Sequence, residues 1–163
     1  MSADALTTLA ARVGATLKAR GLLLATAESC TGGWVSQAVT AIAGSSDWFE
    51  RGFVTYSDAA KQELLGVSAR TLAGHGAVSE PTAREMAVGA LARSRAQLAV
   101  AITGVAGPGG GSPEKPVGTV CFAWLRKDGA LVAQTRRFAG DRESVRRQSV
   151  MAALQGILDL LEG

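Results

Sequence analysis

Residues 22–42, LLLATAESCTGGWVSQAVTAI, contain the strongest indication of fold class in this 163-residue chain. This stretch opens with a short apolar run over residues 22–25, which predicts a buried strand, and an apolar stripe over residues 34–42 predicts a helix. The polar junction at residues 27–33 opens onto the amino end of that helix, where unpaired N–H groups carry partial positive charge. A strand, a glycine-bearing loop and a helix in this order are typical of an α/β domain.

The segments on either side of this unit continue the alternation of helices and strands. Residues 3–20 predict an amphipathic helix that ends at Gly21. Its expected buried stripe consists of Leu6, Leu9, Ala10, Val13 and Leu17. Further strands are predicted at 51–57, 97–103, 117–126 and 130–139, and further helices at 58–65, 68–73, 79–93 and 141–161. We therefore expect a three-layer α/β/α sandwich with a mixed, mostly parallel sheet, in a single domain spanning residues 1–163.

The composition excludes several classes of protein. Hydrophobic residues make up 47% of the chain and charged residues 19%, which indicates a folded domain and not a disordered one. No apolar run approaches the roughly 20 residues that span a bilayer, and the amino terminus lacks the pattern of a secretory signal. Two distant cysteines, Cys30 and Cys121, do not form a disulfide framework. We expect a cytoplasmic protein with free thiols and no membrane partner.

Charge and aromatic content bear on the partners. The net charge of +3 is mild, and 5% aromatic residues offer few stacking platforms, so nucleic-acid binding through the carboxyl-terminal arginines is the weakest alternative. Histidine, cysteine and carboxylate residues show no metal-ligand spacing, so we expect no metal and no other cofactor. Trp34, Trp48 and Phe49 lie near the ends of predicted segments and are candidates for the interface of a homo-oligomer.

Ser29 is the first candidate for chemistry. It would sit at the carboxyl end of a strand and face the amino end of a helix, where N–H groups could stabilise an oxyanion. The loop does not match the G-x-S-x-G elbow of α/β-hydrolases, because Ala27 occupies the first glycine position. The alternative is that Ser29 or Thr31 serves only as the N-cap of the helix.

Cys30 is a rival nucleophile in the same loop. A reactive thiolate needs a lowered pKa, which a helix amino terminus can supply. The usual partner is a histidine, and His75 is the only one in the chain. The alternative is that Cys30 is a small buried apolar residue.

Tyr56 and Lys61, five positions apart, form the second candidate. Serine hydrolases without histidine can use a lysine as general base, sometimes with a tyrosine. Lys61 lies on the first turn of a predicted helix and must be neutral to act as a base. We therefore expect Lys61 to be buried and activity to fall at acid pH, whereas an exposed Lys61 would be an ordinary surface residue.

The third and fourth candidates could contact a ligand. The glycine-rich loop at residues 103–112 follows a buried strand, where α/β proteins place ligand contacts, but it matches neither a Walker loop nor a dinucleotide fingerprint. It could equally be a flexible connection. Asp141 is predicted to cap the last helix, which places Arg142 at a helix amino terminus suited to phosphate, with Arg146 on the same face. A solvated helix face is the alternative.

Together these segments resemble the C-terminal domain family of the competence/damage-inducible protein CinA, in its stand-alone form. The resemblance covers nearly the whole chain and rests on TAESCTGGWVSQAVTAIAGSSDWFERGFVTYSDAAKQELLGV, HGAVSEPTAREMAVGAL, ITGVAGPGGGSPEKPVGTV and FAGDRESVRRQSV. It implies hydrolysis of nicotinamide mononucleotide to nicotinate mononucleotide and ammonia, without a metal, in bacterial pyridine-nucleotide salvage.

The resemblance also implies roles for individual residues. Ser29 would be the nucleophile, and Tyr56 and Lys61 would take its proton and pass one to the leaving ammonia. Arg142 would meet the 5′-phosphate. The other substrate-binding residues would be Thr31, Gly32, Gly44, Ser46, Thr103, Gly104 and Gly107. Two alternatives stay open, the same deamidation with Cys30 as nucleophile and a non-catalytic nucleotide-binding module.

Overall fold

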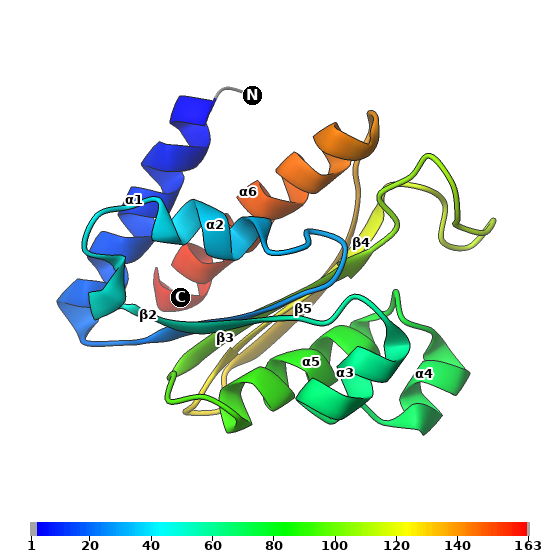
Figure 1. The fold of residues 1–163 in the computed structure, drawn as a ribbon, viewed down its shortest axis with the longest axis horizontal. Helices are drawn as coiled ribbons and strands as arrows, with labels where there is room; N and C mark the ends of the chain where they lie inside the picture. The colour runs from blue at the N-terminus through cyan, green and yellow to red at the C-terminus, as the bar shows by residue number, and fades with distance from the viewer. Residues whose placement is uncertain (1–2, 163) are drawn as a thin grey trace.

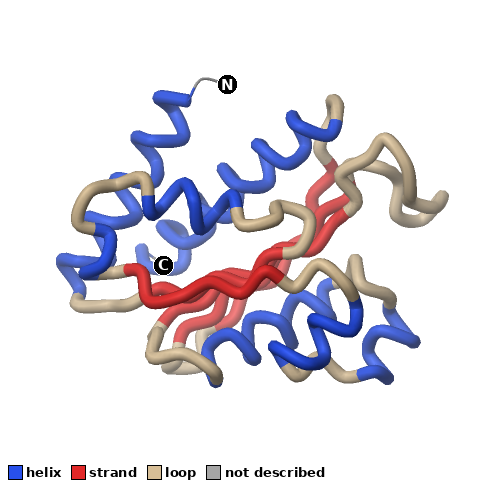
Figure 2. Tube along the Cα trace, viewed as in Figure 1, coloured by secondary structure: helices blue, strands red, loops and turns tan. Residues whose placement is uncertain are grey.

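A five-stranded sheet runs through the middle of the molecule and carries helices on both faces (Figures 1 and 2). The computed structural model describes residues 3–162. The strands are β1 (Leu24–Glu28), β2 (Phe49–Val54), β3 (Leu98–Gly104), β4 (Thr119–Arg126) and β5 (Leu131–Arg137). One face is covered by α1 (Ala3–Arg20), α2 (Trp34–Thr40) and α6 (Arg142–Glu162), and the other by α3 (Asp58–Leu65), α4 (Ala69–His75) and α5 (Glu80–Ala92). The predicted three-layer sandwich is confirmed.

The order of the strands is β2-β1-β3-β4-β5. β1 is parallel to both of its neighbours, whereas β4 is antiparallel to β3 and to β5. Four strands therefore point the same way and only β4 is reversed, as expected for a mixed, mostly parallel sheet. The register places Glu28 beside Val54 and Ile102, so the carboxyl ends of β1, β2 and β3 meet at one edge. Ligands of open α/β sheets bind at such an edge.

The two faces of the sheet are packed with side chains of different size. Towards α1, α2 and α6 the core is built from large residues, and the predicted stripe of α1 is buried throughout. Towards α5 the sheet presents mainly alanine, which lets that helix approach closely. Gly89 of α5 lies so near the end of α3 that a Cβ would come within 1.9 Å of the carbonyl oxygen of Leu65. Glycine is therefore required at this contact.

Some boundaries differ from those predicted. The first strand runs to Glu28 instead of ending at residue 25, because the polar side chains of Thr26 and Glu28 are hydrogen-bonded inside the protein. β2 ends at Val54, three residues early, because the chain turns there into α3 and Ser57 caps that helix. None of the helices within residues 3–162 combines the length and the apolar character that a membrane span requires.

The expectation that Trp48 serves an interface is wrong. Trp48 is buried, and its ring packs on Gly14 so closely that a Cβ there would collide with it. Phe49 packs against the same core. Trp34 is partly buried and lies beneath the guanidinium groups of Arg146 and Arg147. These aromatic side chains stabilise the chain's own fold.

Candidate active site

Ser29 follows β1 directly, at the sheet edge where the carboxyl ends of the parallel strands meet. Its N–H donates to the carbonyl of Ile102 at 3.0 Å, and the N–H of Thr55 donates to the carbonyl of Glu28 at 2.9 Å. The ends of β3 and β2 thus fix the start of the Ser29 turn from both sides. The Ser29 side chain is nearly buried but keeps 7% of its surface exposed.

Lys61 meets Ser29 from α3. Its Nζ lies 3.2 Å from Ser29 Oγ and donates to the carbonyl of Tyr56 at 3.1 Å. Only 1% of the side chain is exposed, as expected from the sequence. Burial lowers the pKa of Lys61, and the carboxylate of Asp58, 4.0 Å away, opposes this shift. The pair therefore joins a hydroxyl group to an amine that is more readily neutral than an ordinary lysine.

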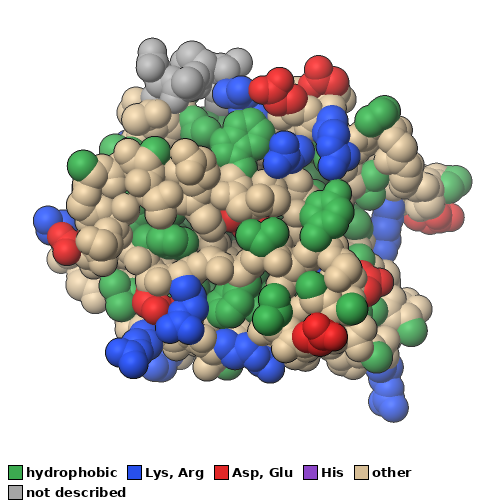
Figure 3. Space-filling model, in the orientation of Figure 1, with side chains coloured by type: hydrophobic (Ala, Val, Ile, Leu, Met, Phe, Trp, Pro, Cys, Tyr) green, Lys and Arg blue, Asp and Glu red, His purple; other side chains and the backbone are tan. Residues whose placement is uncertain are grey.

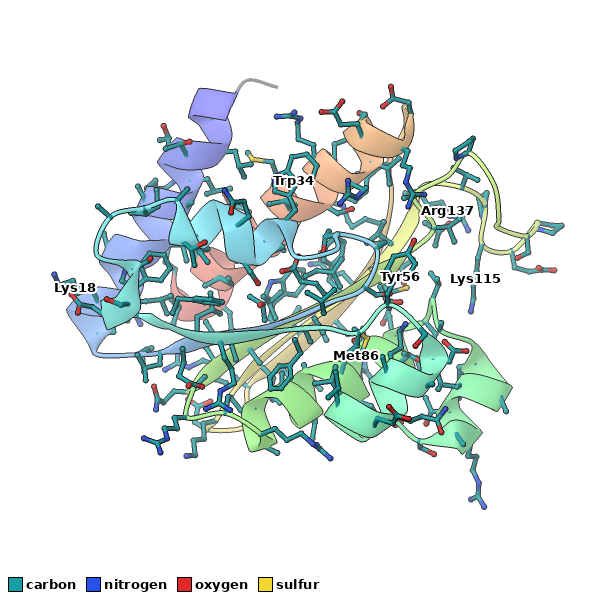
Figure 4. The ribbon with its side chains drawn as sticks, viewed as in Figure 1. Lys18, Trp34, Tyr56, Met86, Lys115 and Arg137 are labelled. Atoms are coloured by element: carbon teal, nitrogen blue, oxygen red, sulfur yellow. The ribbon has the colours of Figure 1, made fainter. Side chains whose placement is uncertain are left out.

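Tyr56 presents different groups to different partners. Its carbonyl, not its phenol, contacts Lys61, and that carbonyl also lies 3.5 Å from Ser29 Oγ. The ring is 62% exposed, and Figure 4 shows it between the two helical layers. The phenol oxygen accepts a hydrogen bond from Arg142 at 3.2 Å, and Arg142 also donates to the carbonyl of Gly107 at 2.7 Å. The structure thus brings Tyr56, Arg142 and Gly107 to the side of the Ser29–Lys61 pair.

Glu28 is a buried residue that sequence reasoning missed. Its carboxylate accepts hydrogen bonds from the hydroxyl groups of Thr31 and Ser36 and from the N–H groups of Val35 and Ser36, at 2.7–2.9 Å. The N-cap position of α2 is Gly33, which has no side-chain cap. The interpretation of Ser29 or Thr31 as the N-cap is therefore wrong. Glu28, at the end of β1, accepts the N–H groups at the start of α2 in place of a cap. No sequence pattern indicates a carboxylate that caps a helix from across a turn.

Arg146 holds the same turn from α6. It donates to the carbonyls of Cys30 and Thr31, at 3.1 and 3.0 Å. Gly32 has φ +58°, a left-handed backbone conformation that favours glycine in this turn. Arg146 was expected on the phosphate-facing side of the helix with Arg142, but it is committed to these carbonyls. Thr31 and Gly32 accordingly shape the turn.

Thr103 and Gly104 end β3 beside Ser29. Thr103 is buried, and its hydroxyl donates to the carbonyl of Ala77 at 2.8 Å. A Cβ on Gly104 would come within 2.9 Å of the carbonyl oxygen of Thr119, so glycine lets β3 pack against β4. In this structure both residues make contacts within the protein.

The structure does not bring Gly44 and Ser46 to Ser29 within one chain. Both are exposed and precede β2, whose first residue, Phe49, pairs with Leu24 at the opposite end of β1. Five strand residues at ~3.3 Å each separate that end from Ser29, or roughly 15 Å. The expectation that Gly44 and Ser46 line the same pocket is wrong for a single chain, because the parallel connection returns β2 to the far end of the sheet.

Cys30 is poorly suited to nucleophilic attack. Burial raises the pKa of its thiol to about 12, and the positive charge of Arg146 offsets only part of the shift. His75, the expected partner, is exposed at the end of α4, where its carbonyl accepts a hydrogen bond from Lys115. Within residues 3–162 there is also no group of three or more histidine, cysteine or acidic residues that could hold a metal ion.

Known proteins with similar sequences cover nearly the whole of this chain. The family model of the CinA C-terminal domain matches residues 6–161. The chain is 57% identical over 155 residues to the nicotinamide-nucleotide amidohydrolase PncC of Escherichia coli K12, covering 95% of this chain and 94% of that protein. The corresponding protein of Pseudomonas putida is 53% identical over 158 residues, with 96% and 98% covered.

A crystal structure of the competence/damage inducible protein CihA from Agrobacterium tumefaciens superposes with a TM-score of 0.94 at 48% identity. The match covers 95% of this chain and 94% of that one. The sequence and the fold therefore agree over nearly the full length, and the chain belongs to the CinA C-terminal domain family.

Proposed function

We propose that the chain is an amidohydrolase that converts nicotinamide mononucleotide to nicotinate mononucleotide and ammonia, with Ser29 as nucleophile. The observation that carries this proposal is the 3.2 Å contact between Ser29 Oγ and the buried amine of Lys61. The name nicotinamide-nucleotide amidohydrolase, borne by the relatives from E. coli and P. putida, supports the choice of substrate.

Lys61 acts as the general base in this mechanism. In its neutral form it accepts the Ser29 proton while Oγ forms a bond to the carboxamide carbon of the substrate. The carbonyl of Tyr56 accepts an N–H of Lys61, which holds the amine beside Ser29. The phenol of Tyr56 contacts Arg142, so we assign the proton transfer to Lys61 alone instead of to both residues. The low pKa of Lys61 keeps a larger fraction of the amine neutral near pH 7.

The tetrahedral intermediate then collapses and breaks the carbon–nitrogen bond. Lys61 returns its proton to the leaving nitrogen, which departs as ammonia and leaves the acyl group as an ester on Ser29. A water molecule, deprotonated by Lys61, attacks this ester. The products are nicotinate mononucleotide and Ser29 with its proton restored, so one water is consumed for each ammonia released.

Arg142 is proposed to bind the 5′-phosphate of the substrate. It is exposed at the start of α6, and its hydrogen bonds to Tyr56 and Gly107 hold its guanidinium beside the Ser29–Lys61 pair. A guanidinium suits phosphate because it offers two parallel N–H donors. Thr103, Gly104 and Gly107 would form the wall of the pocket on the β3 side.

We also propose that the enzyme works in the cytoplasm as a homo-oligomer without a nucleic-acid partner. The two cysteines are buried free thiols. β5 lies at the edge of the sheet with Leu131 and Val132 each 41% exposed, a surface that a second copy could cover. On the face shown in Figure 3, basic side chains form separate groups instead of a stripe. Light scattering on the purified protein tests the oligomer.

The experiment that tests the function is ammonia release from nicotinamide mononucleotide by the purified, metal-stripped protein. Two further substrates are compared: nicotinamide riboside, which lacks the 5′-phosphate, and nicotinamide, which lacks both ribose and phosphate. The proposal predicts turnover that is fastest with the mononucleotide. Binding of the mononucleotide without ammonia would instead favour the non-catalytic nucleotide-binding module.

A further inference from the structure

The turn after Ser29 contains a backbone N–H that is free for a ligand. The N–H of Ser29 itself donates to Ile102, and that of Gly32 donates back to the carbonyl of Ser29 at 3.0 Å. Within the described part of the chain, the N–H groups of Cys30, Thr31 and Gly33 donate to no other residue, and that of Cys30 approaches only its own sulfur, which is a weak acceptor. Of the three, the N–H of Cys30 belongs to the residue that directly follows the nucleophile. An amide at the edge of a nearly closed site, next to the nucleophile, is suited to bind a developing negative charge.

Arg146 controls the direction of the peptide groups in this turn. Its Nε and Nη2 donate to the carbonyls of Cys30 and Thr31, and its guanidinium lies over the ring of Trp34, 5.4 Å from the centroid. Figure 4 shows Trp34 at the start of α2 on the side of α6. Because the guanidinium is a rigid fork and each peptide is planar, two hydrogen bonds fix two successive peptide planes.

The two hydrogen bonds from Arg146 to the turn have an electrostatic consequence. Carbonyl oxygens carry partial negative charge, and two of them turned towards the substrate would repel an oxyanion. Arg146 keeps the carbonyls of Cys30 and Thr31 directed at itself. Glu28 anchors the opposite side of the turn through the hydroxyl of Thr31, at 2.7 Å. The turn is therefore held between a carboxylate under α2 and a guanidinium from α6.

We propose that the N–H of Cys30 binds the oxyanion formed when Ser29 attacks the carboxamide, and that Arg146 is a positioning residue that holds this donor. The inference rests on the proposed amidohydrolase function. When Ser29 Oγ bonds to the carbonyl carbon, the electron pair of the C=O bond moves to oxygen, and that oxygen accepts the Cys30 N–H. When ammonia leaves, the C=O bond re-forms and the hydrogen bond weakens.

The test compares Arg146→Met and Arg146→Lys with the matched control Arg147→Met. Arg147 stacks on the same Trp34 ring, 5.3 Å from its centroid, but makes no hydrogen bond to the turn. We expect Arg146→Met to lower kcat by up to the roughly hundredfold to thousandfold that loss of an oxyanion donor costs, with KM little changed. Arg146→Lys should be intermediate, because an ammonium lacks the fork, and Arg147→Met should match the wild type.

A second readout does not depend on the substrate. A fluorophosphonate probe phosphonylates a reactive serine: Oγ bonds to phosphorus, the P–F bond breaks and fluoride leaves. The P=O oxygen then occupies the oxyanion position. Labelling of Ser29 should slow in Arg146→Met by a factor similar to that for kcat, and not in Arg147→Met. If the wild type labels at Ser29 but releases no ammonia from the mononucleotide, the proposed function fails while the labelling rates still test the role of Arg146.

Melting curves guard against a variant that does not fold. If Arg146→Met is unfolded at the assay temperature, the folded Arg146→Lys decides the matter. Reduced kcat and slower labelling in Arg146→Lys, at a melting temperature equal to that of Arg147→Met, support the inference. Wild-type values of kcat and of the labelling rate in a folded Arg146 variant would overturn it.

Discussion

Lys61 Nζ lies 3.2 Å from Ser29 Oγ, although the two residues are 32 positions apart in sequence. Burial lowers the pKa of this lysine below its ordinary value of 10.5. As a base it must be neutral, so we expect kcat/KM to fall tenfold per pH unit once the pH drops below the lowered pKa. The rate profile from about pH 5 to about pH 10 measures this.

Stability should follow the same titration. The unfolded chain holds the lysine proton up to a higher pH than the folded chain, so the free energy of unfolding rises with pH between the two pKa values of Lys61. Lys61→Arg, which cannot deprotonate, is the control and should be inactive at every pH. A wild-type profile that stays flat into the acid range would contradict the role of Lys61 as base.

Replacing Arg142 should separate binding from chemistry. Arg142 contacts Tyr56 and Gly107 but neither Ser29 nor Lys61. We expect Arg142→Met to raise KM for the mononucleotide by roughly tenfold or more, the cost of a lost charged hydrogen bond, with a much smaller effect on kcat. Steady-state kinetics with nicotinamide riboside, which lacks the phosphate, provide the comparison. An equal loss for both substrates would mean that Arg142 does not read the phosphate.

Glu28 should be essential for stability. Its carboxylate is fully buried and accepts four hydrogen bonds, three of them from the first turn of α2. In Glu28→Gln one carboxylate oxygen is replaced by an N–H₂ group, which cannot accept hydrogen bonds from the N–H and hydroxyl donors around it. We expect this variant to lower the free energy of unfolding by about 1–3 kcal/mol. Urea denaturation measures the change. Glu143→Gln, which removes only an exposed ion pair with Arg147, should cost less than about 1 kcal/mol.

Two glycines on the α3–α5 side should respond in opposite directions to alanine. At Gly89 a new Cβ would collide with the backbone of Leu65, so Gly89→Ala should destabilise by roughly 1–3 kcal/mol through overpacking. At Gly74, inside α4, a Cβ meets nothing within 4 Å. Gly74→Ala should therefore raise stability by about 0.4–1 kcal/mol. Thermal melting of both variants is the measurement, and a stabilised Gly89→Ala would refute the close contact.

Local sequence patterns were sufficient for much of this fold. The apolar spacing of α1, the helix start at Ser79 and the buried strand β3 each depend on a few neighbouring residues, and the structure has them as predicted. The predicted strands at 117–126 and 130–139 likewise correspond to β4 and β5, which pair as an antiparallel hairpin. These features are visible in sequence because the interactions that cause them are between neighbours in the chain.

The features that the sequence did not reveal depend on distant partners. The hydrogen bonds of Arg146 span 115 and 116 residues, and no spacing rule connects α6 to the Ser29 turn. Glu28 was predicted to lie in a polar loop, whereas in the structure it is buried beneath α2. Ser46 was assigned to the pocket by resemblance, and the parallel return of β2 carries it to the other end of the sheet. Topology, not local pattern, decides these placements.

The most direct test of the central claim is ammonia release from nicotinamide mononucleotide by the wild type, Ser29→Ala and Cys30→Ala, measured side by side on folded protein. We expect turnover by the wild type, loss of all measurable turnover in Ser29→Ala, and retention of most turnover in Cys30→Ala, because burial raises the pKa of the Cys30 thiol to about 12. Turnover by Ser29→Ala, together with its loss in Cys30→Ala, would contradict the assignment of Ser29 as the nucleophile.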